Sequence, residues 1–367
     1  MIKKTSLLVT IPLLLLTACQ STFGPSAIQN THNAYNESIV NTLKQQMLLN
    51  LVRLKYRDQA YFLKISSVTA ALSLGGSLGV EAELALNSGG NILTPNIGGA
   101  YVDKPTISYQ PLQGEDFLKS VLSSISLEAI LVMTESGWSV ERIFGVCVER
   151  MNNLHNASSA SGPTPEIAPK FRKFKRMLGL FRKLQKQGEM EIGPDLDLDS
   201  SSENLSILFE VEDVDKESLA ELKKLLDFDT NESGSSALVS ISSNFLKKRP
   251  NELTIRTRSI SSVLFYLSQN IEAPAEHIAQ GLVTQTTTPD GEIFDWVKTP
   301  AGQMLEIYSS ESSPDGAFLA IPYRGYWFYI KDNDLNSKST FMMLMQLFDL
   351  QAGQSKYSGP TLTLPVR

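Results

Sequence analysis

The stretch LSLGGSLGVEAELAL, residues 72–86, decides how the N-terminal part of this 367-residue chain folds. Apolar side chains stand at alternate positions, separated mostly by Ser, Gly and Glu, which is the two-residue period of a β-strand with one apolar face. The turn-forming sequence NSGG follows at residues 87–90, and residues 91–109 show a weaker strand pattern that Pro95 and Pro105 interrupt. We therefore expect a long β-hairpin over residues 68–109.

Helical patterns flank this hairpin. Before it, apolar residues recur every three or four positions and predict an amphipathic helix over about residues 35–56. These residues are Val40, Leu43, Met47, Leu51 and Leu54. After the hairpin, residues 117–121, 127–133 and 140–151 look helical, and Ser139 is placed to cap the last of these helices. The Asn, Ser, Gly and Pro residues of 153–169 favour a boundary there.

Strand and helix patterns interleave through the rest of the chain. The helix patterns cover residues 170–186, 216–228, 261–269 and 339–350, and the strand patterns cover residues 205–211, 253–258, 304–308, 317–323, 326–331 and 361–365. Together the patterns predict an α+β fold, in which N-terminal helices and a long β-hairpin precede a C-terminal region of interleaved strands and helices. The aromatic stretch 323–330, with Arg324-Gly325 as a hairpin turn, favours a buried strand over a partner-binding patch.

The first twenty residues have the pattern of an export signal. Lys3 and Lys4 precede an apolar run at residues 7–16, which as a helix covers roughly 15 Å, about half of a bilayer core. A cleaved signal is therefore favoured over a permanent anchor. The tetrad LTAC at residues 16–19 resembles the lipobox of bacterial lipoproteins, which implies cleavage before Cys19 and lipid on that residue. By the same resemblance, Gln20 in place of Asp implies transfer to the outer membrane.

Four further segments carry a second resemblance. They are DKPTISYQPL at 103–112, RTRS at 256–259, YRGYWFY at 323–329 and TLTLP at 361–365. Together they resemble a family of proteobacterial outer-membrane lipoproteins, over most of the chain that follows the signal. The resemblance implies a Gram-negative envelope location. That family has no assigned activity, so the resemblance supplies no catalytic residues.

These patterns predict five segments. We expect a lipoprotein signal peptide at 1–18, a flexible tether at 19–34 and an N-terminal helical region with the hairpin at 35–155. A linker that carries a basic helix follows at 156–204, and a C-terminal α+β region occupies 205–367.

Composition excludes several classes of site. The chain has 33 basic and 39 acidic residues, a charge of −6, and loss of Lys3 and Lys4 with the signal makes it −8, so we expect no nucleic acid partner. Besides Cys19, whose sulfur is expected to carry the lipid, there is only Cys147, so we expect no intramolecular disulfide, and Cys147 is expected to be a buried, inert thiol. The three histidines lack neighbouring ligands, so we expect them at the surface or in loops and expect no zinc site.

No catalytic motif is evident. The chain has no Ser-x-x-Lys and no Gly-x-Ser-x-Gly pattern. The acidic runs at 195–199 and 332–336 resemble the start of a calcium loop but lack its Gly and its terminal Glu, which favours solvated loops. We expect no metal and no cofactor, and the sequence leans against an enzyme. A hydrolase would instead need distant carboxylates to converge in a pocket, such as Glu115, Asp116, Glu135 and Glu141.

The predicted helix at 170–186 is strongly basic. Its cations are Lys170, Arg172, Lys173, Lys175, Arg176, Arg182, Lys183 and Lys186, and Phe171, Phe174, Leu178 and Phe181 form an apolar stripe beside them. One interpretation is a domain helix with a solvated cationic face. The other is contact with an anionic surface, namely lipid headgroups, lipopolysaccharide phosphates or an acidic partner.

The sequence thus leads to two functional hypotheses. The first is a periplasm-facing outer-membrane lipoprotein, held to the membrane by its N-terminal lipid, that serves as an accessory or interaction subunit of an envelope assembly through an unidentified protein partner. The alternative is an oligomeric outer-membrane pore or secretion-conduit component that uses the 68–109 hairpin. One hairpin would leave unpaired edges in lipid, so this alternative requires a homo-oligomer.

Overall fold

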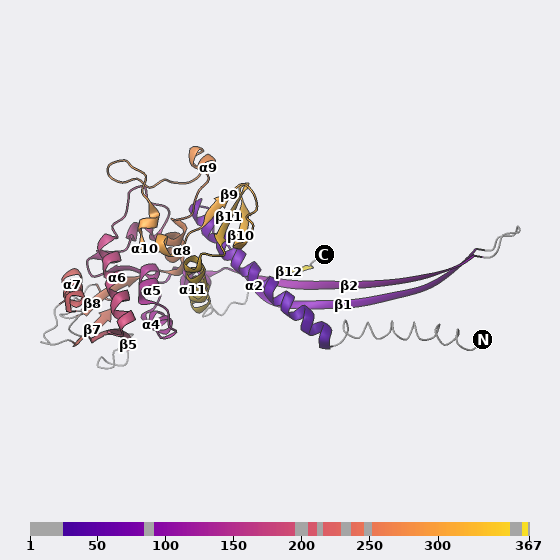
Figure 1. The fold of residues 1–367 in the computed structure, drawn as a ribbon, viewed down its shortest axis with the longest axis horizontal. Coiled ribbons are helices and arrows are strands. Elements are labelled where there is room, and N and C mark those ends of the chain that lie inside the picture. The colour runs from indigo at the N-terminus through magenta and orange to yellow at the C-terminus, as the bar shows by residue number, and fades with distance from the viewer. Residues whose placement is uncertain are drawn as a thin grey trace. The chain divides into compact units, whose positions relative to one another are not determined.

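The computed structural model describes residues 25–83, 92–194, 205–210, 216–228, 236–245, 252–352 and 362–365. Contacts divide the chain into two units (Figure 1). The larger contains residues 1–60 and 121–353, and the smaller contains residues 61–120 and 354–367. The described elements are helices and strands in several sheets, which confirms the predicted α+β class.

The smaller unit is built on the predicted hairpin. Strands β1 (Phe62–Glu83) and β2 (Ile92–Leu112) pair antiparallel from Phe62↔Leu112 to Glu83↔Ile92, with a register shift between Ile65 and Ser67. The short strand β12 (Leu362–Pro365) pairs with the other edge of β2. Helix α3 (Glu115–Leu122) follows β2. The hairpin is confirmed and is longer than predicted, while the side chains of its alternating stretch lie outside those described.

The larger unit begins with helix α2 (Pro25–Lys55). The predicted helix at 35–56 is present, but α2 starts ten residues earlier, inside the segment expected to be a tether. Its C-terminal half is buried through Met47, Leu48, Leu51 and Val52. Within the described residues, no helix combines the length and the apolar composition that are needed to cross a bilayer.

A six-stranded sheet organises one half of the larger unit. Its order is β4-β3-β8-β7-β6-β5, and only β7 and β8 run parallel. The strands are β3 (Val148–Met151), β4 (Leu154–His155), β5 (Met190–Pro194), β6 (Leu205–Glu210), β7 (Ser236–Ser242) and β8 (Glu252–Thr257). The stretch 156–204, expected to be a linker, thus contributes β5 to this sheet.

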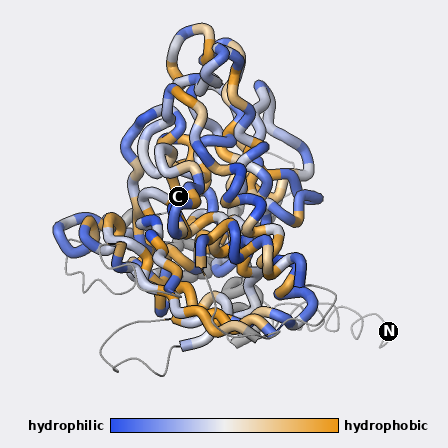
Figure 2. The backbone as a smooth tube through the Cα atoms, turned by 90° about the vertical axis from the view of Figure 1, so that its left-hand side faces the viewer, coloured by the Kyte–Doolittle hydropathy of each residue, from blue (hydrophilic) through white to orange (hydrophobic). Residues whose placement is uncertain are grey.

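Helices pack against this sheet through aromatic side chains. The helices are α4 (Leu127–Glu135), α5 (Val140–Cys147), α6 (Arg172–Gln187) and α7 (Lys216–Leu226). Phe181 of α6 lies 6.0 Å from Phe144 of α5 and 6.3 Å from Phe209 of β6, measured between ring centroids. In Figure 2 hydrophobic and hydrophilic residues alternate along the described helices, as expected for helices with one face on the core.

A second, three-stranded sheet has the order β10-β11-β9. Strands β10 (Ala317–Tyr323) and β11 (Tyr326–Lys331) match the predicted bounds and are joined by Arg324 and Gly325, both with positive φ, as in a type I′ turn. Strand β9 is Tyr308–Ser310. The surrounding helices are α8 (Ile260–Ser268), α9 (Ala275–Ala279), α10 (Pro300–Met304) and α11 (Leu335–Ala352).

Two predicted elements were wrong. The helix expected at 140–151 ends at Cys147, and its last four residues form β3 because they pair with β8. The strand expected at 304–308 is not one, since Met304 ends α10 and β9 begins only at Tyr308. Strands β5 and β7 were not predicted at all.

Candidate functional site

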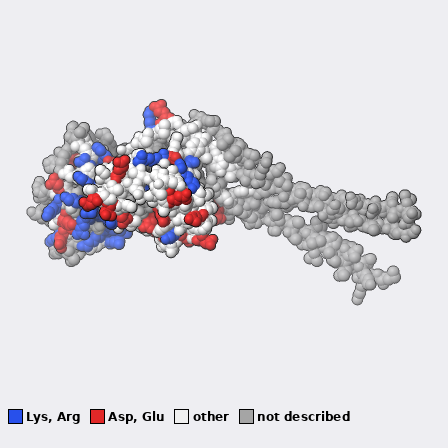
Figure 3. Space-filling model, turned by 90° about the horizontal axis from the view of Figure 1, so that it is seen from above, with Lys and Arg blue, Asp and Glu red and all other residues white. Residues whose placement is uncertain are grey.

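Helix α6 presents an apolar face to the core and a cationic face to solvent. Its buried side chains are Phe174, Met177, Leu178, Leu180, Phe181 and Leu184. Leu, Lys, Arg and Gln dominate the helix because they are good helix formers, and Gly188 ends it in the left-handed conformation. Figure 3 shows Lys and Arg side chains gathered toward the end of the larger unit that carries α6 and α7.

Several cations of α6 are engaged within the protein. Arg176 forms a bidentate pair with Glu221 of α7, with N···O distances of 2.7 and 2.6 Å, and this pair lowers the pKa of Glu221. The Lys183 ammonium donates to Ser218 over 3.1 Å, and that of Lys175 donates to the Lys298 carbonyl over 2.9 Å. These contacts fix α6 to its neighbours.

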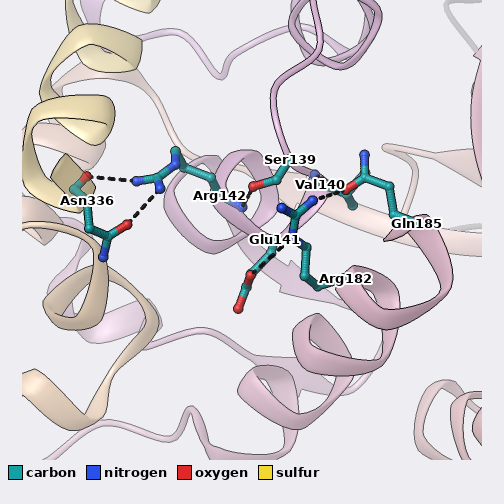
Figure 4. Close-up of polar contacts among 7 residues, drawn as sticks. All are labelled: Ser139, Val140, Glu141, Arg142, Arg182, Gln185 and Asn336. Carbon is teal, nitrogen blue, oxygen red and sulfur yellow. Dashed lines mark hydrogen bonds and ion pairs between the residues drawn. The ribbon is translucent and has the colours of Figure 1, made fainter. Parts of the chain in front are cut away.

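The junction of α5 and α6 is also polar (Figure 4). Gln185 accepts from the Val140 backbone N–H over 3.2 Å, and Arg182 lies 3.9 Å from Glu141. Ser139 accepts from the Arg142 N–H over 3.2 Å, which confirms its predicted role as a helix cap. Arg182 therefore helps to hold α5 and α6 together.

The cations at the start of α6 differ from these. In the described part of the chain, the side chains of Lys170, Arg172 and Lys173 make no hydrogen bond or ion pair. All three are exposed and line one cavity of about 810 Å³. The same cavity is lined by Leu154, His155, Phe171, Thr288, Pro289, Asp290, Ile293, Phe294, Asp295 and Lys298. Four cations and two carboxylates thus share its wall, an excess of positive charge in an acidic chain.

The first turn of α6 adds backbone donors to this wall. Phe171 at the N-cap position makes no side-chain capping bond, and the first turn contains no acidic residue. The first N–H groups of a helix have no partner within it and carry the positive end of the helix dipole. An anion in the cavity would therefore meet these N–H groups together with the unpaired cations.

The pKa of His155, which also lines this cavity, is affected by the positive charges around it. It is half-buried, and its Nδ1 lies 3.1 Å from the Ser158 hydroxyl oxygen. Burial, followed by the charges of Arg150 and Lys170, lowers the pKa of His155 below its ordinary value. The imidazole is therefore neutral at pH 7, and an anion bound beside it would raise its pKa.

The other sequence-predicted sites behave differently. Cys19 and the acidic run at 195–199 lie outside the described residues. In the second acidic run, Asp334 accepts from the N–H of Ser337 over 3.0 Å at the start of α11, and Asp332 lies 2.7 Å from Lys338. Over the described ranges, no group of three or more His, Cys, Asp or Glu side chains is arranged to hold a metal ion.

Cys147 is fully buried, as predicted, and burial raises the pKa of its thiol to about 12. The thiol is therefore protonated and a poor nucleophile. The cavity at the start of α6 is not lined by Glu115, Asp116, Glu135 or Glu141, the carboxylates that a hydrolase was expected to bring together.

One histidine prediction was wrong. His277 is only 5% exposed, and its Nδ1 lies 2.7 Å from the hydroxyl oxygen of Tyr56 at the end of α2. Asp58 follows and accepts hydrogen bonds from Tyr323 and from Arg324, the latter over 2.9 Å. Tyr56 and His277 are 221 positions apart, so sequence spacing gave no sign of their contact.

Comparisons of the chain with protein-family models, curated proteins and solved structures find no match.

Proposed function

We propose that this chain is a lipid-anchored protein of the Gram-negative envelope, held on the periplasmic side of the outer membrane through Cys19. In this proposal it acts as a non-enzymatic accessory subunit that binds a phosphate-bearing headgroup in the cavity at the start of α6. The lipobox and Gln20 support the location. The observation that carries the activity is the set of three unpaired cations, Lys170, Arg172 and Lys173, on one cavity wall.

The physical chemistry of the cavity suits phosphate. Hydrogen bonds between cationic donors and phosphate oxygens are short and about twice as strong as those between neutral groups. Each basic residue near an anionic surface contributes about 1 kcal/mol, so three would contribute about 3 kcal/mol. A volume of about 810 Å³ lies in the usual range for ligand pockets and admits a headgroup.

The test measures calorimetric binding of glycerol 3-phosphate, with glycerol as the neutral probe, to the lipidated protein in a neutral detergent. Replacing Lys170, Arg172 and Lys173 together by Gln should weaken binding of the phosphate at least tenfold, because it removes the unpaired donors. The matched control replaces Arg176, Lys183 and Lys186 by Gln. It removes the same amount of charge from the same helix, at positions that do not line the cavity.

Equal losses in both triple variants would refute a defined site and leave only general charge attraction. A second measurement follows the pKa of His155 by NMR. Glycerol 3-phosphate should raise it in the unmodified protein and leave it unchanged in the cavity variant. A His155 that does not respond to the ligand would place any binding elsewhere.

A second candidate function rests on the length of the hairpin. Strands β1 and β2 have 22 and 21 residues, more than the nine to eleven that a strand needs to cross a bilayer. The alternative proposal is therefore an oligomeric pore or conduit component. It requires that the detergent-extracted protein be an oligomer and that this oligomer depend on the hairpin.

A further inference from the structure

A second cavity, of about 380 Å³, lies within the larger unit. It shares Ile293, Phe294 and Asp295 with the wall of the first cavity, but the three unpaired cations of the proposed function do not line it. It is bounded by the end of α2, the end of α8 and the segment that leads into β9. Its wall combines one buried cation, the carboxylates of Glu272, Asp295 and Glu306, and an apolar surface, and Asp295 already lies 3.9 Å from the Lys298 ammonium. The apolar residues include Ile271, Ile278, Val283, Ile293 and Trp296.

The cation is Lys55, which is only 7% exposed. Its ammonium donates one hydrogen bond, over 2.8 Å, to the main-chain carbonyl of Gln269. An ammonium has three N–H donors, so two are left without an acceptor in the described residues. Gln269 also lines the cavity, and its side-chain Oε1 is buried without a donor there. A buried charge with unused donors is costly unless another group satisfies it.

The carboxylates Glu272 and Glu306 lie together at another part of the wall. One oxygen of Glu272 accepts from the Ser309 N–H over 3.0 Å, and one oxygen of Glu306 accepts from the Tyr308 hydroxyl. The hydrogen bond to Glu306, followed by burial and by the charges of Glu306, Asp334 and Glu272, raises the pKa of Tyr308. The second oxygen of each has no hydrogen bond in the described residues and can accept one from a ligand.

The cavity thus has a positive pole, Lys55, and a negative pole, Glu272 with Glu306, and the two are separate. Among the described residues Lys55 forms no ion pair with Glu272 or Glu306, so its ammonium nitrogen lies more than 4.0 Å from their carboxylate oxygens. A ligand that meets both poles must therefore carry its own charges apart. In a single amino acid they are adjacent, whereas an extended dipeptide spans about 7 Å.

We propose that this cavity binds a short zwitterionic peptide with apolar side chains. The peptide's terminal carboxylate accepts hydrogen bonds from Lys55, and its terminal ammonium donates to Glu272 and Glu306. Its side chains pack on the apolar surface near Ile271 and Trp296. This arrangement supplies the missing partner of each pole.

The probes are the dipeptide Leu-Leu, its N-acetyl form, which lacks the ammonium, and its C-terminal amide, which lacks the carboxylate. Calorimetry on the full chain in neutral detergent should show Leu-Leu binding at least tenfold more tightly than either capped form. Lys55→Met should bind Leu-Leu and its amide equally well, because the partner of the carboxylate is gone, but should still bind Leu-Leu more tightly than the acetyl form. The Glu272→Gln, Glu306→Gln double variant should bind Leu-Leu and its acetyl form equally well, but should still bind Leu-Leu more tightly than the amide.

Lys186→Met and Glu217→Gln serve as controls, since both residues are exposed on helices away from this cavity. Both should preserve the full pattern. Equal binding of all three probes to the unmodified protein, or binding of none, overturns the proposal. The probe series on the unmodified protein decides the question even where a cavity variant fails to fold.

Discussion

At the residue scale, Arg258 is the most deeply buried charged side chain among the described residues of the larger unit. It is 1% exposed, and its guanidinium donates mainly to main-chain carbonyls, including that of Val148 over 2.8 Å. It also donates to the Ser161 hydroxyl over 3.1 Å and lies 3.9 Å from the Tyr266 ring centroid. The charge is thus balanced by dipoles and a ring face, and the loop between α5 and α6 depends on it.

We expect Arg258→Met to lower the free energy of unfolding by about 3 kcal/mol or more, because it removes a charged donor from four main-chain carbonyls, of which only those of Val148 and Ala157 keep another donor among the described residues. Denaturant unfolding measures this loss. Arg256→Met is the control, since Arg256 stands two positions earlier on β8 and is exposed, and it should cost less than about 1 kcal/mol. Similar losses for both variants would show that the buried network has no special weight.

Lys55 gives a prediction about pH. Its pKa is lowered from 10.5 to about 8 by burial, so between these values the unfolded chain binds more protons than the folded one. Stability attributable to Lys55 therefore rises with pH through this window, by about 1.4 kcal/mol per pH unit. Below pH 8 the residue is charged in both states, and the burial cost is present in full.

The measurement compares urea unfolding of the unmodified protein and of Lys55→Met at pH 7.5 and pH 10. The unmodified protein should gain about 2 to 3 kcal/mol relative to the variant over this interval. Tyr56, whose pKa is raised to about 12, is present in both proteins and cancels in the difference. Parallel pH profiles would mean that the ammonium is solvated in the folded protein.

At the element scale, the hairpin can be shortened by deleting residues of the smaller unit only. Gly75 and Ala100 face each other in the register, as do Leu74 and Tyr101. Deleting residues 75–100 and joining Leu74 to Tyr101 through an Asn-Gly turn retains the pairing of β2 with β12. Because all deleted residues belong to the smaller unit, the melting temperature of the larger unit should change by less than about 2 °C.

The same deletion separates the two candidate functions. The cavity proposal expects the deletion variant to bind glycerol 3-phosphate as tightly as the full chain does. The pore alternative expects the full chain to be an oligomer in detergent and the variant to be a monomer. Analytical ultracentrifugation distinguishes these outcomes, and a monomeric full chain would exclude the pore.

Elements with a single strong period were predictable from the sequence. The bounds of α6, β10 and β11 were predicted to within two residues, and the hairpin was predicted but begins six residues earlier than expected. The stretch Val148–Met151 was not, because its apolar spacing continues that of α5, while its conformation is set by pairing with β8 more than a hundred positions later. Strands β5 and β7 likewise depend on partners that periodicity does not reveal.

The candidate sites divide in the same way. Sequence identified the basic segment but did not distinguish Lys170, Arg172 and Lys173 from the cations that pair with α7, because the cavity is completed by residues near 290. Lys55 was missed although the signal was present. It stands seven positions after Leu48 and four after Leu51, so it continues the buried stripe of α2.

At the scale of the whole molecule, the net charge limits how the cationic cavity can act. Without the proposed signal, which carries Lys3 and Lys4, the charge falls from −6 to −8, so the chain is repelled by an anionic surface at long range. Screening confines such forces to about 8 Å at physiological ionic strength, so the few unpaired cations act only in close contact. Membrane attachment through lipid would provide that contact. The proposed binding at the cavity would then depend on the proposed lipid at Cys19.

The last prediction therefore concerns Cys19 and Gln20. Under the proposed lipoprotein assignment, Cys19→Ser should leave an unprocessed chain without lipid, because it removes the thiol that is proposed to accept the lipid. Gln20→Asp should leave lipidation intact but retain the mature protein in the inner membrane. Radiolabelled palmitate and density-gradient separation of the two membranes measure both outcomes. Stable anchoring needs at least two acyl chains, and without the Cys19 thiol the chain should receive none. A Cys19→Ser protein that is still processed and membrane-bound would therefore contradict the lipoprotein assignment.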